Sequence, residues 1–527
     1  MSEAIRSYRP PRGASYDGPS RPRGFIRSIV FLLMIMAFVW LVWTTRDNCP
    51  VERVIPQNQS FHFQVPDLLT TRQEVAQSAI WDTGLVPGQY ESIPEWIGTS
   101  FGYPDWVLNN LVSDACYVSG TDLTRFSDLL VVTRMSRVGC LLERYHRFVD
   151  GIEDEFAGGL RLRKLKGVDF YYAVRGRTLI FSPARDAIIR ALTLREDDAL
   201  ASLETAGMDG SEDLRGRVVF SGEDGMGRYV ERLDCRLDVT TESIVFRSES
   251  LLKTAWRGPL DGLRLGSPAT SIPVPDGGGF LLTGEFGVPL AEVWRTVDGL
   301  AGGSMTDSAA GWGILDQLSD AERSAFVPLL EELAGNLGTG FRLSAEGVDL
   351  NGVLPLPVFD LAFKPTGAGQ QALSEVPVEL TPDVLPQSGI PYTREGNEIT
   401  HFPLGWGDGV EPSVYAQSGR AHVTLHPAHA MLLASSRQPE STLDHAGHLY
   451  LRLRPSELLT SFHDGLLLYA SEGLLPGHTA GSLESMLQAA QGASEQISEV
   501  DTQLSYTDGL LTVALRIDMA PATVVAE

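Results

Sequence analysis

Lysine and cysteine are both scarce in this sequence of 527 residues. Lysine occurs at only four positions, so nearly all of the positive charge is arginine. The four cysteines are Cys49, Cys116, Cys140 and Cys235, and no two of them form a Cys-x-x-Cys pair. A thioredoxin-like redox site or a zinc ribbon needs that pair, so the sequence supports neither. The cysteines all follow the membrane anchor predicted below, in a compartment where disulfides form, and their pairing stays open.

Several motifs of common enzyme classes are also missing. There is no Walker A sequence, and no Gly-x-Gly-x-x-Gly follows a predicted strand, so nucleotide binding lacks support. The Ser-x-x-Lys pattern at residues 250–253 is followed by neither Ser-Asp-Asn nor Lys-Thr-Gly. We therefore predict that the protein is not an enzyme and that it carries no cofactor.

Positive charge is scarce over most of the chain, whose formal net charge is -25. The first 27 residues carry six arginines against Glu3 and Asp17, a net charge of +4, which leaves -29 for the remainder. Binding to phosphate groups depends on basic surface, so we expect no nucleic acid as a partner.

A long hydrophobic run is present at residues 28–45, eighteen residues without a charge. As a helix it extends about 27 Å at about 1.5 Å per residue, close to the roughly 30 Å hydrocarbon core of a bilayer. A cleaved signal peptide usually has an apolar region of about 7–15 residues and small residues before its cleavage site. Trp40 and Trp43 are bulky instead. We predict an uncleaved transmembrane helix over residues 28–45.

The placement of arginine predicts the orientation of this helix. Six arginines precede it, whereas only Arg46 and Arg53 follow closely. Positive residues favour the cytoplasmic side, so the N-terminus is expected in the cytoplasm. The prediction is a single-pass signal anchor in the bacterial inner (cytoplasmic) membrane. Residues 1–27 would be a disordered cytoplasmic tail, and the C-terminal domain would be extracytoplasmic, in the periplasm.

One pattern recurs in residues 170–192 and 413–435. Each copy has Tyr-Ala-x-x-Gly-Arg, an apolar strand, then Pro-Ala and an apolar helix, with one extra residue in the second strand. The matched pairs are Tyr172 and Tyr415, Ala173 and Ala416, Gly176 and Gly419, Arg177 and Arg420, Pro183 and Pro427, Ala184 and Ala428. Glycine suits a tight turn and proline suits the first turn of a helix. The pattern predicts an internal repeat of strand–proline–helix units.

The predicted fold class is α+β, with antiparallel sheets and helices packed on one face, in a two-part ectodomain. Proline-rich residues 46–122 are expected to form a stalk that leads into the first packed layer. Residues 123–265 and 280–520 are predicted to be two α+β repeat domains, joined by a Gly- and Pro-rich linker at residues 266–279. Asp508-Gly509, between two apolar segments, predicts a tight hairpin turn.

Tandem units of this kind behind a single N-terminal anchor resemble bacterial membrane-anchored proteins classed as domains of unknown function. The resemblance covers residues 123–520 and depends on structural motifs such as Tyr-Ala-x-x-Gly-Arg. It implies an architecture and a location, and it implies no activity.

Histidines are concentrated in the second part of the chain, where eight of the ten lie between His401 and His478. In a strand, His422 and His426 share one face, and His429 follows in the first turn of a helix. Zinc binds imidazoles at about 2.0–2.1 Å, which makes His422, His426 and His429 candidate metal ligands. The alternative is a structural role. The first copy of the repeat has Ser182 and Arg185 at the places of His426 and His429, and this favours the structural role.

These features predict a protein that acts by binding, or as an envelope assembly or scaffold component, without catalysis. Its partners would be the membrane, through its own N-terminal helix, and other proteins of the envelope, while its oligomeric state stays open. Two alternatives are a binding module for a lipid or other apolar ligand, held between sheet and helices, and a metal-dependent enzyme that uses the His422/His426/His429 cluster.

Overall fold

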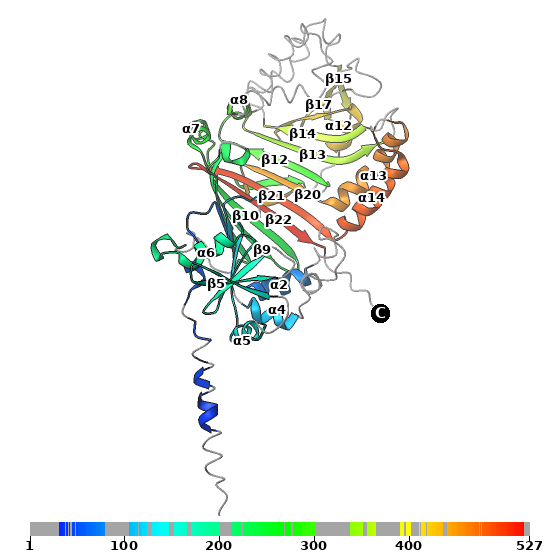
Figure 1. The fold of residues 1–527 in the computed structure, drawn as a ribbon. Helices are drawn as coiled ribbons and strands as arrows, with labels where there is room; N and C mark the ends of the chain where they lie inside the picture. Colours follow the sequence, from blue (N-terminus) through cyan, green and yellow to red (C-terminus); the bar gives the residue numbers. More distant parts are fainter. Residues whose placement is uncertain are drawn as a thin grey trace, which may run out of the picture.

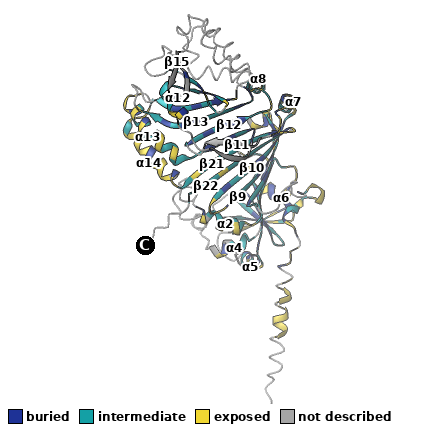
Figure 2. Ribbon diagram, turned by 180° about the vertical axis from the view of Figure 1, so that it is seen from behind, coloured by how far each residue is buried: buried dark blue, intermediate teal, exposed yellow. Residues whose placement is uncertain are grey.

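The computed structural model describes residues 31–78, 105–200, 212–300, 338–364 and 390–520, with short gaps inside these ranges. Twenty antiparallel strands form one continuous sheet, and a separate two-stranded sheet lies against it (Figures 1 and 2). Helices pack on the large sheet, so the α+β class with antiparallel pairing is confirmed.

The pairings give the strand order from one edge of the sheet to the other as β4, β5, β6, β7, β3, β2, β1, β8, β9, β10, β22, β21, β20, β12, β13, β14, β18, β17, β16, β15. The strands of the first half are β1 (Phe61–Val65), β2 (Cys116–Gly120), β3 (Leu130–Arg134), β4 (Ile152–Ala157), β5 (Leu160–Leu165), β6 (Tyr171–Arg175), β7 (Thr178–Ser182), β8 (Leu214–Val219), β9 (Val230–Val239) and β10 (Ser243–Leu252). Those of the second half are β12 (Phe280–Glu285), β13 (Gly340–Asp349), β14 (Leu356–Phe363), β15 (Ile390–Arg394), β16 (Asn397–His401), β17 (Ser413–Gln417), β18 (Arg420–Thr424), β20 (Leu449–Leu453), β21 (Ile497–Thr507) and β22 (Leu510–Met519).

The two halves have the same topology. Counted from the edges, β4 to β7 correspond to β15 to β18, then β3, β2 and β1 to β14, β13 and β12, and finally β8, β9 and β10 to β20, β21 and β22. The halves meet where β10 pairs with its counterpart β22, from Ser243 opposite Asp518 to Leu251 opposite Leu510. The chain therefore contains one ten-strand topology twice.

The two repeated sequence units occupy corresponding places in this topology. One is the β6–β7 hairpin followed by α6 (Arg185–Thr193), and the other is the β17–β18 hairpin followed by α12 (Pro427–Ser435). Both turns hold a glycine with positive φ, Gly176 at 65° and Gly419 at 74°. The matched tyrosines differ, because Tyr415 packs with Ala430 of α12 whereas Tyr172 packs with Cys140, away from α6. The order of elements is shared, but the side-chain environments are not.

Helices lie on both faces of the sheet rather than on one. The consecutive residues Tyr172 and Ala173 of β6 point to opposite faces. Tyr172 packs with Cys140 of α5 (Arg137–His146), and Ala173 packs with Ile188 of α6. The expectation of a single covered face is therefore wrong. A sheet whose two faces both carry apolar side chains at this edge needs a helix on each of them.

The other helical elements are η1 (Val51–Val54), α2 (Leu68–Gln77), α4 (Asp105–Leu111), α7 (Thr254–Leu263), α8 (Leu290–Leu300), α13 (Pro455–Ser471) and α14 (Ala480–Ser494). Figure 1 shows α13 and α14 together at one side of the second half and α7 and α8 at the other.

The chain packs into the first core almost directly after residue 45. Cys49, Val51 and Val54 are buried with Ile180, and the Thr178 hydroxyl donates to the Cys49 carbonyl oxygen at 2.7 Å. The described part of residues 46–122 thus contains packed elements, including β1 and β2, and the sheet begins there rather than at residue 123.

Residues 266–279, expected to be a linker, contain β11 (Ala269–Pro275), which pairs with β19 (Glu440–Gly447) in the second sheet. This small sheet lies over β20 and β21, at the centre of the rear view in Figure 2. All four cysteines are free thiols, and Cys235 is buried against Gly216.

The predicted membrane anchor is only partly within the described residues. Residues 31–36, 38–40 and 42 are helical, and Phe31 and Trp40 are 65% and 54% exposed. Among the described residues, no helix is both long and apolar enough to cross a bilayer. The transmembrane helix over residues 28–45 stays a prediction, and the tail at residues 1–27 lies outside the described residues.

Candidate functional site

A row of apolar side chains crosses eight neighbouring strands on one face of the sheet. The residues that lie opposite one another, strand by strand, are Val423, Leu361, Leu343, Leu282, Leu451, Thr502, Leu515 and Phe246. Their neighbours two positions along the strands face the same way. They include Phe280, Phe341, Phe359, Leu449, Leu453, Leu504 and Val513. These fifteen residues are called the apolar face below.

The opposite face of the same strands is polar. Its side chains include Arg342, Asp360, His422, Tyr450, Arg452 and Asp501. These six residues are called the polar face below.

Burial of the two faces is the reverse of what polarity alone suggests. On the polar face, Asp360 and Arg452 are each 4% exposed and Tyr450 is 1% exposed. All fifteen residues of the apolar face are only half-buried. The consecutive residues Leu281 and Leu282 of β12 show the contrast, since Leu281 is 1% exposed and Leu282, on the apolar face, is half-buried. A large apolar surface that stays open is typical of a binding site.

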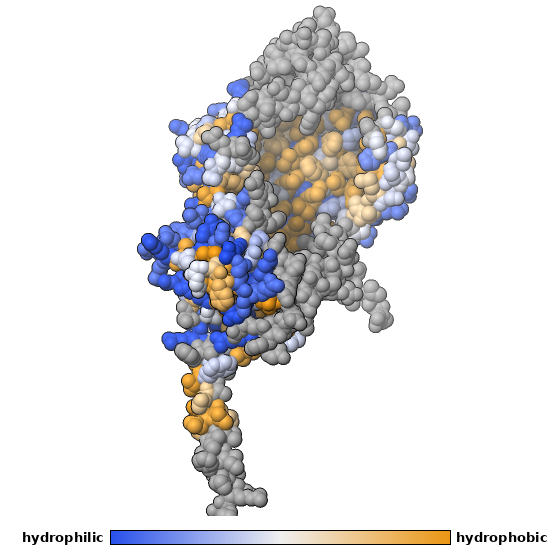
Figure 3. Space-filling model, viewed as in Figure 1, coloured by the Kyte–Doolittle hydropathy of each residue, from blue (hydrophilic) through white to orange (hydrophobic). Residues whose placement is uncertain are grey.

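Helices bound the apolar face at its sides. At one end of the strands, Leu511 and Tyr506 pack with Trp256 and Leu260 of α7 and with Val293 of α8. Along the opposite side lie α13, which contacts β13 and β21, and α14. Figure 3 shows a hollowed hydrophobic surface between these two sides. The sheet forms the floor of this hollow, and the helices form its rims.

The polar face is covered and internally paired. Nδ1 of His422 lies 2.9 Å from Oδ1 of Asp360, and the His422 ring stacks on Tyr415 with centroids 4.6 Å apart. Arg342 lies on the other side of the same carboxylate, with Nη2 3.8 Å from Oδ2. Helix α12 packs over this region through Ala430. Burial is the main cause that raises the pKa of Tyr415 well above its usual range, and the nearby Asp360 carboxylate adds to it.

A second polar group lies further along the same face. The Tyr450 hydroxyl donates to Asp501, and Arg454 donates to Glu499 at 2.7 Å. Burial, opposed by the Tyr450 hydrogen bond and reinforced by neighbouring Glu499, raises the pKa of the Asp501 carboxyl to about 6. Asp501 lies opposite Arg452 and Arg516 in the two adjacent strands. These hydrogen bonds link the β20 end of the sheet to β21 on the polar side.

Each of the three candidate metal ligands has a different hydrogen-bond partner. His422 is bonded to Asp360, as described above, whereas Nε2 of His429 lies 3.2 Å from Asp349. Nδ1 of His426 accepts a hydrogen bond from the Ala428 N–H at 3.2 Å. Burial lowers the pKa of His429, and the Asp349 carboxylate opposes that shift.

The role of His426 has a counterpart in the first copy of the repeat. There the Ser182 hydroxyl accepts from the Ala184 N–H at 3.0 Å, at the corresponding hairpin–helix joint. His448, another of the histidines between His401 and His478, lies elsewhere and accepts from the Tyr506 N–H at 3.1 Å. Within the described ranges, no three His, Cys, Asp or Glu side chains are grouped closely enough to bind a metal ion. The geometry favours the structural role of these histidines.

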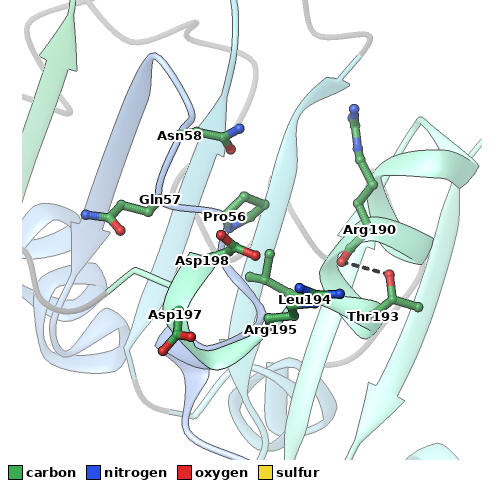
Figure 4. A pocket seen from close by; sticks show the side chains of 9 residues that line it. All are labelled: Pro56, Gln57, Asn58, Arg190, Thr193, Leu194, Arg195, Asp197 and Asp198. Atoms are coloured by element: carbon green, nitrogen blue, oxygen red, sulfur yellow. Dashed lines mark hydrogen bonds between the residues drawn. The ribbon is translucent and has the colours of Figure 1, made fainter.

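A pocket of about 560 Å³ lies on the first half of the molecule (Figure 4). It is open to solvent and is lined by Pro56, Gln57, Asn58, Arg190, Thr193, Leu194, Arg195, Asp197 and Asp198. Main-chain contacts form its floor, since the Gln57 N–H donates to the Asp198 carbonyl oxygen at 2.9 Å. In Figure 4 the charged side chains do not converge on one point, so the pocket suggests no specific chemistry.

One short run in the sequence fits the nucleophile-elbow motif of α/β-hydrolases. Residues 98–102 read Gly-Thr-Ser-Phe-Gly and match Gly-x-Ser-x-Gly. A nucleophile elbow needs a β-strand directly before this motif. Only Trp96 and Ile97 separate it from Pro94 and Glu95, which leaves too short an apolar run for such a strand. The motif lies outside the described residues.

No family model and no curated protein matches the chain. Among solved structures, crystal forms I, III and IV of TP0453 are similar to part of it, at 7%, 8% and 8% sequence identity. They cover 39%, 42% and 44% of this chain and 80%, 90% and 89% of their own, with TM-scores of 0.25, 0.26 and 0.27. At these values the likeness carries no argument about fold or function, and the resemblance drawn from the sequence stays a prediction.

Proposed function

We propose that this protein is a membrane-anchored, extracytoplasmic binding protein whose apolar face holds the hydrocarbon part of a lipid or similar apolar ligand. The observation that carries the proposal is the reversed burial of the sheet. Around Asp360, Tyr450 and Arg452 its polar side is covered by α12 and the β11–β19 sheet, whereas the fifteen residues of the apolar face are half-open.

The energetics of burial favour a ligand on this face. Fully burying one Leu, Val or Phe side chain that would otherwise be exposed stabilises a complex by about 1.5–3 kcal/mol. All but one of the fifteen residues of the apolar face are of these types, the exception being Thr502, and each keeps part of its surface in contact with solvent. A ligand that covers several of them gains several such contributions, less the cost of fixing its position.

The chemistry of the face restricts the ligand. On this side of the eight strands, up to the bulge that follows Ala345 in β13, the described residues carry no charge. Phosphate, carboxylate and metal ligands need charged or polar partners, and these are placed on the polar face instead. The complementary ligand is therefore hydrocarbon along most of its contact.

The predicted anchor would keep the domain near a source of such ligands. The N-terminal segment enters the first core within a few residues of position 45, so a span over residues 28–45 would hold the domain close to the bilayer. A domain tethered in this way meets lipids without diffusing through the periplasm.

Binding of a fluorescent phosphatidylcholine to the domain tests the proposal. A protease site is inserted between residues 43 and 46 of the full chain, and the domain is released from membranes after it has folded there. Leu343→Gln and Leu451→Gln each place a polar amide on the apolar face. We expect each to weaken probe binding about tenfold, since 1.4 kcal/mol corresponds to a factor of ten.

Leu432→Gln is the matched control, because Leu432 is 58% exposed on α12, away from the apolar face. It should bind the probe like the unchanged protein. If all three variants and the unchanged protein bind equally, or if none binds, the face does not hold hydrocarbon and the proposal is wrong.

A further inference from the structure

The open part of the apolar face is long compared with one lipid chain. It extends from Phe246 in β10 through β22, β21, β20, β12, β13 and β14 to Val423 in β18. Seven spacings of about 4.8 Å between neighbouring strands give a row about 34 Å long. The hydrocarbon core of a bilayer is about 30 Å thick and holds two opposed leaflets, so one chain reaches about 15 Å. The row is therefore about twice as long as a single chain.

The row is also continuous. Between Phe246 and Val423, its only polar side chain is the uncharged Thr502, near the middle. Aliphatic neighbours flank Thr502 on the same face, Val500 and Leu504 in its own strand and Leu451 and Leu515 in the strands beside it. A charged residue here would divide the face into two separate sites, and the described residues of this row, from Phe246 to Val423, include none.

The two ends of the row lie at different distances from the N-terminus. In Figure 1, β10 and β22 lie on the side of the N-terminal helical segment, and β14 lies on the far side of the sheet. A ligand along the row therefore extends away from the predicted membrane anchor.

From this length and continuity we propose that the apolar face holds two hydrocarbon chains at once, one over β10 and β22 and the other over β13 and β14. This inference rests on the proposed function and specifies its ligand as a lipid with two or more chains, or two lipids bound end to end. The charge outside the anchor, -29, disfavours an anionic headgroup, so the ligand class is a neutral or zwitterionic lipid.

Photo-crosslinking of the full chain in membranes tests the two ends separately. A benzophenone-bearing phenylalanine replaces Phe246 at one end or Leu361 at the other, and a third variant carries both. The same amino acid at Phe156 is the control, because Phe156 is 69% exposed on β4 in the first half. The chains are reconstituted in vesicles of dioleoylphosphatidylcholine that contain a radiolabelled tracer of this lipid.

We expect both single variants to be labelled at least tenfold more than the Phe156 control. Intact-protein and peptide mass spectrometry of the double variant should show molecules crosslinked at both positions. Labelling in dioleoylphosphatidylglycerol vesicles should be at least threefold lower, and equal labelling there would overturn the headgroup class.

The outcomes separate this inference from the proposed function. Labelling at only one end, or no molecule crosslinked at both positions, overturns the two-chain arrangement while hydrocarbon binding stands. No labelling above the Phe156 control at either end overturns both. Thermal unfolding of each variant is monitored by circular dichroism. A cooperative transition like that of the unchanged protein shows that the substituted chain is folded.

Discussion

Eight neighbouring strands form both faces of the central sheet: β10, β22, β21, β20, β12, β13, β14 and β18. The two faces differ in the side chains they carry and in how far these are covered. One bears Asp360, His422, Tyr450 and Arg452, all nearly inaccessible to solvent. On the other, the fifteen residues of the apolar face remain half-open, although Ala345, Phe363 and Ala421 on the same side are buried. In an ordinary two-layer protein the apolar face is the covered one. Under the proposed function, stability and binding are divided between the two sides of one sheet.

Substitutions on the polar face should lower the free energy of unfolding more than substitutions on the apolar face. Asp360→Ala removes the carboxylate between His422 and Arg342 at a position only 4% exposed. Breaking a buried pair in this way typically destabilises by about 3–5 kcal/mol. Urea unfolding of the released domain measures it. The control Asp464→Ala removes a carboxylate whose side chain is 80% exposed and should change the free energy of unfolding by less than about 0.5 kcal/mol. Equal effects of the two substitutions would contradict the comparison.

Leu281 and Leu282 sharpen the comparison because they are neighbours of the same type on opposite faces. Leu281→Ala should lower the free energy of unfolding by about 2–5 kcal/mol, since it empties a buried site. Leu282→Ala should lower it by about 1 kcal/mol or less, because the side chain is half-exposed, while it weakens binding of an apolar probe. Unfolding and binding curves of both variants check this. The reverse order of stability would show that the apolar face is the core.

Asp501 adds a pH dependence to the buried side. Burial raises the pKa of its carboxyl to about 6, above the ordinary value of about 3.9. A raised carboxyl pKa means that the folded state binds the proton more tightly, so this group adds stability as pH falls from 7 toward 4. Relative to Asp501→Asn, the unchanged protein should gain stability between pH 7 and pH 5. Parallel stability profiles of the two proteins over that range would refute the assignment.

The smallest expected effect is that of His426→Ser. The Ser182 hydroxyl makes the same hydrogen bond at the corresponding joint of the first half, so serine should replace His426 within about 0.5 kcal/mol. Thermal unfolding measures the change. Elemental analysis for zinc, copper and nickel is the companion test, and a metal present in the unchanged protein but lost in this variant would revive the metal site.

Much of the local structure is predictable from the sequence. The Asp508-Gly509 turn between β21 and β22 has positive φ at both residues, 50° and 82°, as the pair predicts. The hairpin–helix units also follow from glycine at the turn and proline near the helix start. These features depend on neighbouring residues only, which is why a single sequence suffices for them.

The division of faces is harder to predict. Alternation in β20 shows that Leu449, Leu451 and Leu453 share a face, and the ordinary expectation places that face inside. Which face is covered depends instead on β11 and β19, elements remote from one another in the chain, that pack over β20 and β21. The pairing of His422 with Asp360, 62 positions away, is equally invisible to local patterns.

Lipid carried away by the released domain is the most direct test of the account. The full chain is cleaved at the inserted site in phosphatidylcholine vesicles, the vesicles are sedimented, and phospholipid is quantified in the soluble fraction. The account predicts phospholipid bound in about stoichiometric amount, and several-fold less in the Leu343→Gln, Leu451→Gln double variant. A folded domain that is released from the vesicles without bound phospholipid would contradict the account.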